Sequence, residues 1–219
     1  MATRTVILAG ASGLVGREIL QGLLADATVS AVHSIGRRTL AVQHPKLASH
    51  VVDFGALPPL PAADEAYLAL GTTIKVAGSQ AAFRAVDYDA NLATAKAALA
   101  AGVKRIGLVS AMGADAGSKV FYSRVKGELE AALTQMPFDG LVIARPSLLV
   151  GDRAELGQPI RRGEELGYAL SQRLGFLIPK NYRPINSAAV AQALLSAVPA
   201  TRGKTVLLSG SLHRLQATA

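Results

Sequence analysis

The chain has 219 residues, a length that suits one α/β domain. Half of the residues are hydrophobic, 17% are charged and none is cysteine, so disorder, disulfides and thiolate metal sites are excluded. The four histidines have no metal-ligand spacing, and no apolar run approaches the ~20 residues of a membrane span. Lysine and arginine exceed the acids by eight, which favours an anionic partner: nucleic acid, a membrane surface or a phosphorylated small molecule.

Short apolar strand patterns alternate with helical patterns along nearly the whole chain. The expected strands are 5–9, 29–35, 51–54, 67–70, 105–110, 141–144 and 205–208. The expected helices are 14–24, 80–101 (ending at Gly102), 122–136 and 187–198 (capped by Ser187). Loops are expected at the proline-rich 57–61 and the glycine-bounded 71–78. This order predicts a Rossmann-like, doubly wound parallel sheet in a single domain over residues 1–219, with 151–186 as a lid or insertion on the substrate side.

A glycine-rich turn follows the first strand and opens the first helix. Its spacing is G-x-x-G-x-x-G, which differs from the usual G-x-G-x-x-G of dinucleotide-binding sheets. Three glycines alone fit any strand–helix turn, but this position favours a phosphate site at the helix start. The residues expected to contact the cofactor there are Gly10, Ser12, Gly13, Leu14, Val15 and Gly16.

Two arginines, Arg37 and Arg38, stand after the second strand, where an NAD enzyme typically has an acid for the ribose 2′-hydroxyl. Guanidinium groups suit a 2′-phosphate, so we expect NADP(H) to be preferred and NAD(H) to be possible. The alternative is that both merely solvate a loop. Asp53 and Phe54 end the third strand pattern and are expected near the adenine, although Asp53 could equally cap the next turn.

Tyr122 and Lys126 lie four residues apart at the start of a predicted helix, so both face the same side. A lysine ammonium beside a tyrosine lowers the pKa of the phenol from its usual ~10. Such a phenol can exchange a proton with a carbonyl or alcohol while a hydride moves to or from a nicotinamide. An exposed helix-supporting pair is the alternative, and the position after the fifth strand favours the catalytic reading.

Several motifs in this order resemble the short-chain dehydrogenases/reductases of the atypical or extended kind. They are GASGLVG at 10–16, Asn91 in DYDANLATAKAALAAGVKR, LVSAMG at 108–113, YSRVK at 122–126 and RPSLLVGDR at 145–153. The Leu-Gly-Thr-Thr loop at 70–73 and the Val-Lys-Gly-Glu run at 125–128 are similar to those of the Tat-interacting-protein-type subgroup and its bacterial relatives.

The resemblance implies a role for each matching residue. Tyr122 would be the acid/base, and Lys126 would bind the nicotinamide ribose. Ser110 would orient the substrate oxygen, but Ala111 and Met112 follow it where extended members often have more hydroxyl residues, which puts catalytic competence in doubt. The other residues expected along the cofactor are Leu70, Gly71, Thr72, Asn91 and Pro146, with Asn91 either binding a relay water or lying on the helix surface.

The sequence therefore predicts an NADP-dependent oxidoreductase or epimerase-like enzyme on a small carbonyl or alcohol substrate. The alternative is an NADPH-binding regulator with little or no turnover. Specific nucleic-acid binding is not expected, because aromatic residues are only 5% and basic residues are not concentrated on one helix. A homodimer is possible, since helices around Asn91 and Tyr122 often pair in the families it resembles. The first strand begins directly after the N-terminus, so we expect no signal peptide and a cytoplasmic location.

Overall fold

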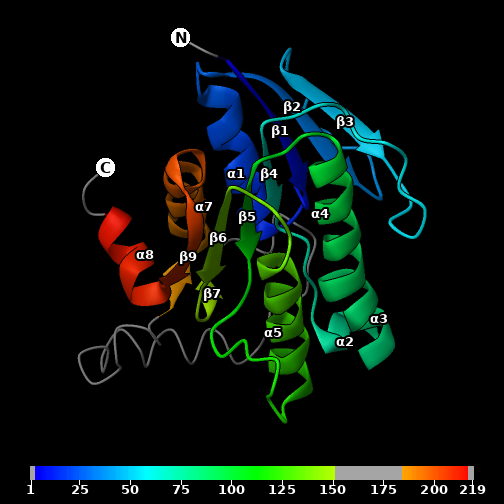
Figure 1. Cartoon of the computed structure of the whole chain (residues 1–219), viewed down its shortest axis with the longest axis vertical. Helices are drawn as coiled ribbons and strands as arrows, with labels where there is room; N and C mark the ends of the chain where they lie inside the picture. The colour runs from blue at the N-terminus through cyan, green and yellow to red at the C-terminus, as the bar shows by residue number, and fades with distance from the viewer. Residues whose placement is uncertain (1–2, 151–183, 217–219) are drawn as a thin grey trace.

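The computed structural model of the chain describes residues 3–150 and 184–216, and their core is a seven-stranded parallel sheet (Figure 1). Its strands are β1 (Arg4–Ala9), β2 (Val29–Gly36), β3 (Leu47–Val51), β4 (Glu65–Leu68), β5 (Arg105–Val109), β6 (Gly140–Arg145) and β9 (Gly203–Leu208). Their order is β3-β2-β1-β4-β5-β6-β9, and every neighbouring pair is parallel. The order reverses between β1 and β4, which confirms the doubly wound, Rossmann-like prediction.

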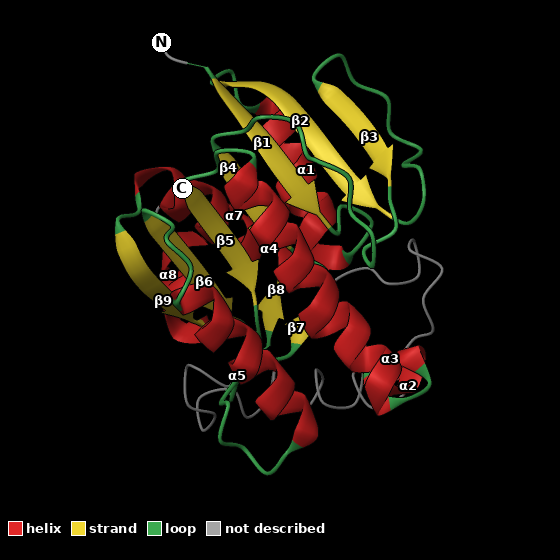
Figure 2. Cartoon of the chain, turned by 45° about the vertical axis from the view of Figure 1, so that its right-hand side comes forward, coloured by secondary structure: helices red, strands yellow, loops and turns green. Residues whose placement is uncertain are grey.

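Helices cover both faces of the sheet. They are α1 (Leu14–Ala25), α2 (Ile74–Ala77), α3 (Gln80–Arg84), α4 (Asn91–Ala100), α5 (Phe121–Thr134), α7 (Ser187–Ala197) and α8 (Ser209–Gln216). Figure 2 shows α4 and α5 in front of the sheet, with α1 and α7 behind it. Successive β1 side chains alternate between the faces: Val6 and Leu8 pack in the core with α1 and α7, whereas Ile7 and Ala9 pack in the core under α4 and α5. A central strand buried on both faces needs the continuous apolar run found in β1.

The long helix predicted over 80–101 is interrupted. α3 begins at the N-cap Ser79, whose hydroxyl accepts a hydrogen bond from Ala82 N at 3.0 Å, and is followed by a π-helical turn, η1 (Ala85–Ala90), before α4. Periodicity cannot reveal a π turn, because it adds one residue without ending the helix. The loop expected over 71–78 contains the short helix α2, which also escaped prediction.

Other boundaries differ by a few residues from the prediction. The third strand lies at Leu47–Val51 rather than 51–54, because this edge strand is only half-buried and lacks a clear apolar run. Asn186, not Ser187, caps α7, with its side-chain oxygen accepting from Ala188 N at 2.9 Å. The 57–61 segment is a loop, as expected. The helix α8 was also not anticipated, nor was a small parallel pair formed by β7 (Leu149–Val150) and β8 (Ile185–Asn186).

Candidate functional site

Two glycines shape the loop between β1 and α1. Gly10 has a φ of +91°, and a Cβ there would lie 2.5 Å from the carbonyl carbon of Ala69, just beyond β4. A Cβ on Gly16 would lie 2.0 Å from the carbonyl oxygen of Gly10. At Gly13 the nearest atom is that same oxygen, at 3.4 Å. The first and third glycines therefore bring strand, loop and helix into contact, and the middle one keeps the approach to α1 free of a side chain.

The start of α1 offers backbone N–H groups to a ligand. Gly13 is the N-cap and has no side chain to accept a bond from them, and the described first turn of α1 holds no acid. Ser12 is exposed, whereas Leu14 and Val15 are buried, so these two can offer only their main chain. The positive end of α1 is thus left for an anion. This loop fits the pyrophosphate of a dinucleotide.

Arg37 and Arg38 lie directly after β2, on the carboxyl edge of the sheet, and both are exposed. Within residues 3–150 and 184–216, neither guanidinium has a hydrogen-bond or ion-pair partner. Asp53 accepts a hydrogen bond from Gly55 N at 2.9 Å, so it caps a turn, one of its two expected roles. Phe54 packs partly buried against the core under α4 and α5.

The ammonium of Lys126 is held by Asp87 of η1, which the sequence analysis did not single out. Lys126 Nζ lies 2.7 Å from Asp87 Oδ1, and the two side chains are only 5% and 0% exposed. The other carboxylate oxygen of Asp87 accepts from Thr72 N at 2.8 Å. Burial raises the pKa of Asp87, while the ammonium of Lys126 and the N–H of Thr72 oppose that rise. One carboxylate thus joins α5 to the loop after β4.

The loop after β4, which contains Leu70, Gly71 and Thr72, lies beside this ion pair. A Cβ on Gly71 would lie 3.5 Å from Asp87 Oδ1 and 3.8 Å from Lys126 Nζ. A side chain there would stand against both charged groups. Because Gly71 has no side chain, the backbone of the loop after β4 can lie close to Lys126.

Asn91 is fully buried and is therefore not a helix-surface residue. Its Nδ2 donates to the carbonyl oxygens of Leu70, Val86 and Asp87, each at 3.2 Å. Two of these carbonyls belong to the π-helical turn and the third to the loop after β4. Asn91 therefore stabilises the turn that carries Asp87. Its own Oδ1 is buried without a hydrogen-bond partner in the described part of the chain.

Tyr122 lies in the first turn of α5, one turn before Lys126, and is half-buried. Its ring centroid is 5.4 Å from that of Phe83, a fully buried residue of α3. Phe83 thus supports one side of the Tyr122 ring. Among the described residues, the Tyr122 hydroxyl has no hydrogen-bond partner, which leaves it available to a ligand.

Ser110 is tied into the fold. Its hydroxyl donates to Glu130 Oε1 at 2.5 Å, and Glu130 also accepts from Arg145 Nη2 at 2.5 Å. Ser110 and Glu130 are both buried. Pro146, the next residue after Arg145, is buried and accepts from Met112 N at 2.8 Å, which joins the segments that follow β5 and β6. The Ser110 hydroxyl therefore faces an acid two turns beyond Tyr122 on α5.

The structure brings Gly71, Thr72 and Lys126 together through Asp87, and joins Asn91 to Leu70. Asp87 could have been noticed in the sequence, because it is an acid in an alanine-rich helix four residues before Asn91. Glu130 could have been noticed in the same way, because it is an acid four residues after Lys126. The insertion predicted over 151–186 lies, up to residue 183, outside the described residues.

Comparisons with known proteins agree with the sequence resemblance. No protein-family model matches the chain. Rat (Rattus norvegicus) protein HTATIP2 is 38% identical over 162 residues, which cover 71% of this chain and 66% of the rat protein. The protein FMP52-1, mitochondrial, of Scheffersomyces stipitis is 35% identical over 197 residues, which cover 86% of this chain and 85% of that protein.

Solved structures share the fold at much lower identity. The Bordetella bronchiseptica enzyme WbmH, in complex with NAD⁺, has a TM-score of 0.69 and 17% identity over 95% of this chain and 76% of its own. The oxidoreductase ylbE from Lactococcus lactis has a TM-score of 0.63 and 16% identity, and the match covers 97% of each chain. At this level of identity the likeness shows a common fold.

The expected cytoplasmic location is overturned by the relatives. The fungal relatives from Emericella nidulans, Coccidioides immitis and Candida albicans are named as mitochondrial proteins. Among the helices of the described segments, none is both long and apolar enough to cross a membrane.

The family that the sequence motifs indicated is confirmed by these relatives. Two different relatives match at 35% identity or more, and one of them matches along 85% of its length. The chain belongs to the HTATIP2/FMP52 family, the Tat-interacting-protein group of atypical short-chain dehydrogenases/reductases.

Proposed function

We propose that this chain binds NADP(H) and reduces or oxidises a small carbonyl or alcohol substrate. The observation that carries the proposal is the placement of Tyr122 and Lys126 one turn apart on α5, with Lys126 buried beside the loop after β4. Ligands of doubly wound sheets bind beyond the carboxyl ends of the strands, which is where these groups lie. The glycine loop at the start of α1 opens on the same edge.

The chemistry divides between the chain and its cofactor. When bound, the nicotinamide would supply or accept the hydride. Tyr122 donates its phenolic proton to the substrate oxygen when a carbonyl is reduced, and takes a proton from the alcohol in the reverse direction. Lys126 stabilises the phenolate left behind, because an ammonium nearby favours the charged form of the phenol. Phe83 holds the Tyr122 ring from one side.

The preference for NADP(H) over NAD(H) rests on Arg37 and Arg38. Both are exposed at the end of β2 and lack a polar partner within the described residues. Guanidinium groups form paired, charge-assisted hydrogen bonds to phosphate, and such bonds would recognise the 2′-phosphate that NAD lacks.

Calorimetric titration with NADPH and NADH tests this proposal. The wild-type protein should bind NADPH at least tenfold more tightly, and the Arg37→Ser/Arg38→Ser variant should lose most of that preference, since charge-assisted bonds each contribute about 1.5–3 kcal/mol. Arg202→Ser/Lys204→Ser is the matched control, because it removes two exposed charges near the opposite edge of the sheet. A wild-type preference for NADH would overturn the assignment of both arginines, and binding of neither cofactor would overturn the function.

A second function is favoured by the surroundings of Ser110. Its hydroxyl is engaged by Glu130, and the next two residues, Ala111 and Met112, carry no hydroxyl. A protein that binds NADPH tightly but lacks a hydroxyl to orient the substrate would act as a cofactor-dependent regulator with little or no turnover. Tight NADPH binding with no activity on a broad carbonyl panel would decide for this alternative.

A further inference from the structure

The buried carboxylate of Asp87 has a place in the site that the Tyr122–Lys126 chemistry does not explain. It lies on the π-helical turn η1, is 0% exposed, and contacts two separate elements. One oxygen pairs with Lys126 on α5, and the other accepts from Thr72 N in the loop after β4. A buried carboxylate is costly unless it is paired and hydrogen-bonded, and Asp87 achieves both through these two contacts.

Hydrogen bonds from Asn91 stabilise the π-helical turn that places Asp87 beside Lys126. The π turn presents the Asp87 side chain to α5, and Asn91 fastens that turn by donating to the carbonyls of Val86 and Asp87. Asn91 also donates a hydrogen bond to the carbonyl of Leu70. Leu70 belongs to the loop after β4, where Thr72 N donates to Asp87. Two buried side chains from one helical segment therefore fix the position of this loop relative to Lys126.

We propose that Asp87 is the positioning residue for Lys126: the buried ion pair fixes the lysine ammonium beside the cofactor loop. This inference rests on the proposed function, in which Lys126 meets the nicotinamide end of the dinucleotide. An ammonium that is only 5% exposed loses most of its hydration, and the Asp87 carboxylate 2.7 Å away compensates for that loss.

The other acids near Lys126 are either paired with another residue or exposed. On α5, Glu128 pairs with Arg84 of α3, and Glu130, one turn beyond Lys126, pairs with Arg145 of β6. On η1, the remaining acid Asp89 is exposed. From the loop after β4, only backbone of Gly71 and Thr72 is near the ion pair. Asp87 is thus the acid that compensates Lys126 within the described part of the chain.

Comparing the binding of the whole cofactor with that of its adenosine part distinguishes a positioning role of Asp87 from a general loss of structure. The probes are NADPH and adenosine 2′,5′-bisphosphate, which carries the 2′-phosphate but no nicotinamide. Asp87→Asn should weaken NADPH binding about tenfold and leave binding of the bisphosphate within twofold, because Lys126 lies away from Arg37 and Arg38 along the sheet edge. Equal losses for both probes, or no loss for either, would overturn the proposal.

A pH profile adds a readout that a purely structural role would not move. In Asp87→Asn the buried ammonium of Lys126 has no counter-charge, so NADPH affinity should fall between pH 7 and pH 9 more steeply than in the wild type. The Asp87→Asn/Lys126→Met variant contains neither charge and should lose this extra pH dependence. A profile identical to that of the wild type in Asp87→Asn contradicts the proposal.

The double variant also covers the case in which Asp87→Asn does not fold, because it leaves no unpaired buried charge. If Asp87 acts only through Lys126, the double variant should bind NADPH as Lys126→Met does, within twofold. A further loss in the double variant would overturn the inference. Wild-type protein that binds neither probe would instead refute the proposed function, and the positioning role with it.

Discussion

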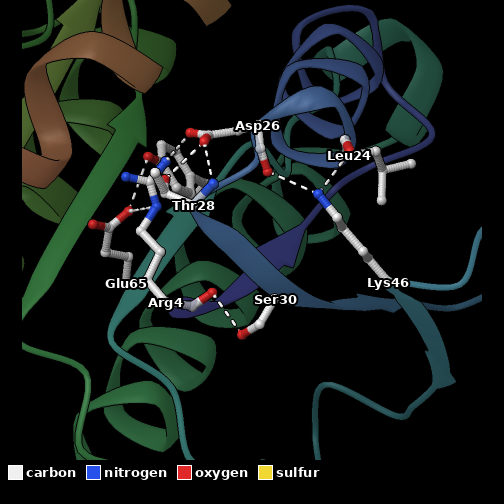
Figure 3. Close-up of polar contacts among 8 residues, drawn as sticks. Arg4, Leu24, Asp26, Thr28, Ser30, Lys46 and Glu65 are labelled. Atoms are coloured by element: carbon white, nitrogen blue, oxygen red, sulfur yellow. Dashed lines mark hydrogen bonds and ion pairs between the residues drawn. The ribbon is translucent and has the colours of Figure 1, made fainter. Parts of the chain in front are cut away.

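The two edges of the parallel sheet, where the strands begin and where they end, differ in how fully their charged groups are paired. At the amino edge, where β1, β2 and β4 begin, charged groups are paired within the chain (Figure 3). Arg4 lies 2.6 Å from Asp26 and 3.6 Å from Glu65. Asp26 also accepts two hydrogen bonds from Thr28, which hold its pKa below the usual value. Lys46 donates to the carbonyls of Leu24 and Asp26 at the end of α1, where a cation is favoured.

At the carboxyl edge, several polar groups are left without a partner in the described segments. Arg37, Arg38 and the hydroxyl of Tyr122 have none, and the start of α1 has no capping side chain. Other carboxyl-edge charges are paired, since Lys126 pairs with Asp87 and Arg145 pairs with Glu130. Within the described segments, Arg37 and Arg38 are charges at this edge that remain free for an anionic ligand. Substitutions at the two edges should therefore separate stability from binding.

The largest effect is expected at Tyr122. Tyr122→Phe removes the exchangeable proton but keeps the ring on Phe83, so turnover should fall about a thousandfold, within the usual range for losing an acid/base group. NADPH affinity should stay within twofold. Steady-state rates and calorimetry check both. Tyr88→Phe is the control, because Tyr88 is a nearby tyrosine that lies under the Arg84 guanidinium at 4.3 Å. Unchanged turnover in Tyr122→Phe would disprove the assigned mechanism.

A smaller effect, a loss of NADPH affinity, is expected from a substitution in the glycine loop. In Gly16→Ala the new Cβ would lie 2.0 Å from the carbonyl oxygen of Gly10, and backbone cannot yield as a side chain can. The loop must shift, so NADPH affinity should fall on the order of a hundredfold, corresponding to ~3 kcal/mol.

Gly22→Ala is the matched control on the same helix. Its Cβ would meet only the end of the Leu195 side chain, at 2.3 Å, and that side chain can rotate away. Gly22→Ala should change stability slightly and leave NADPH affinity alone. Equal affinity losses in both variants would show that α1 packing, not the loop, governs binding.

Much of this fold could be predicted because its signals are local. The apolar run of β1, the glycine loop and the Tyr122–Lys126 spacing each lie within a few residues, and strand–helix alternation limits the topology. β3 was misplaced because an edge strand needs no apolar run: its Val51 is 59% exposed. The π turn also escaped prediction, because it adds one residue without ending the helix.

The site was predicted less completely than the fold, because its contacts join residues that are far apart in the sequence. Lys126 was identified, but its partner Asp87 was not, because the two are joined only when η1 packs on α5. Ser110 was expected to face a substrate, whereas its hydroxyl is bonded to Glu130, twenty residues away in sequence. Which polar group pairs with which depends on tertiary packing, and spacing along one helix cannot supply it.

The smallest expected effect is a pH dependence at the amino edge. Burial raises the pKa of Glu65, and the Arg4 guanidinium only partly opposes this. A carboxyl with a folded pKa above its unfolded value of about 4.3 adds stability below that unfolded value, and the added stability is lost as pH rises through the folded pKa. The free energy of unfolding of the wild type, relative to Glu65→Gln, should therefore increase by at most about 1 kcal/mol from pH 7 to pH 4.5.

Urea unfolding at several pH values measures this difference, with Glu18→Gln as a surface control on α1. NADPH affinity at neutral pH should be the same in Glu65→Gln and wild type, because Glu65 lies at the opposite edge from the glycine loop. A difference that shrinks on acidification would mean that attraction to Arg4 outweighs desolvation of Glu65. A loss of NADPH affinity in this variant would instead couple the two edges, and the separation of stability from binding would no longer hold.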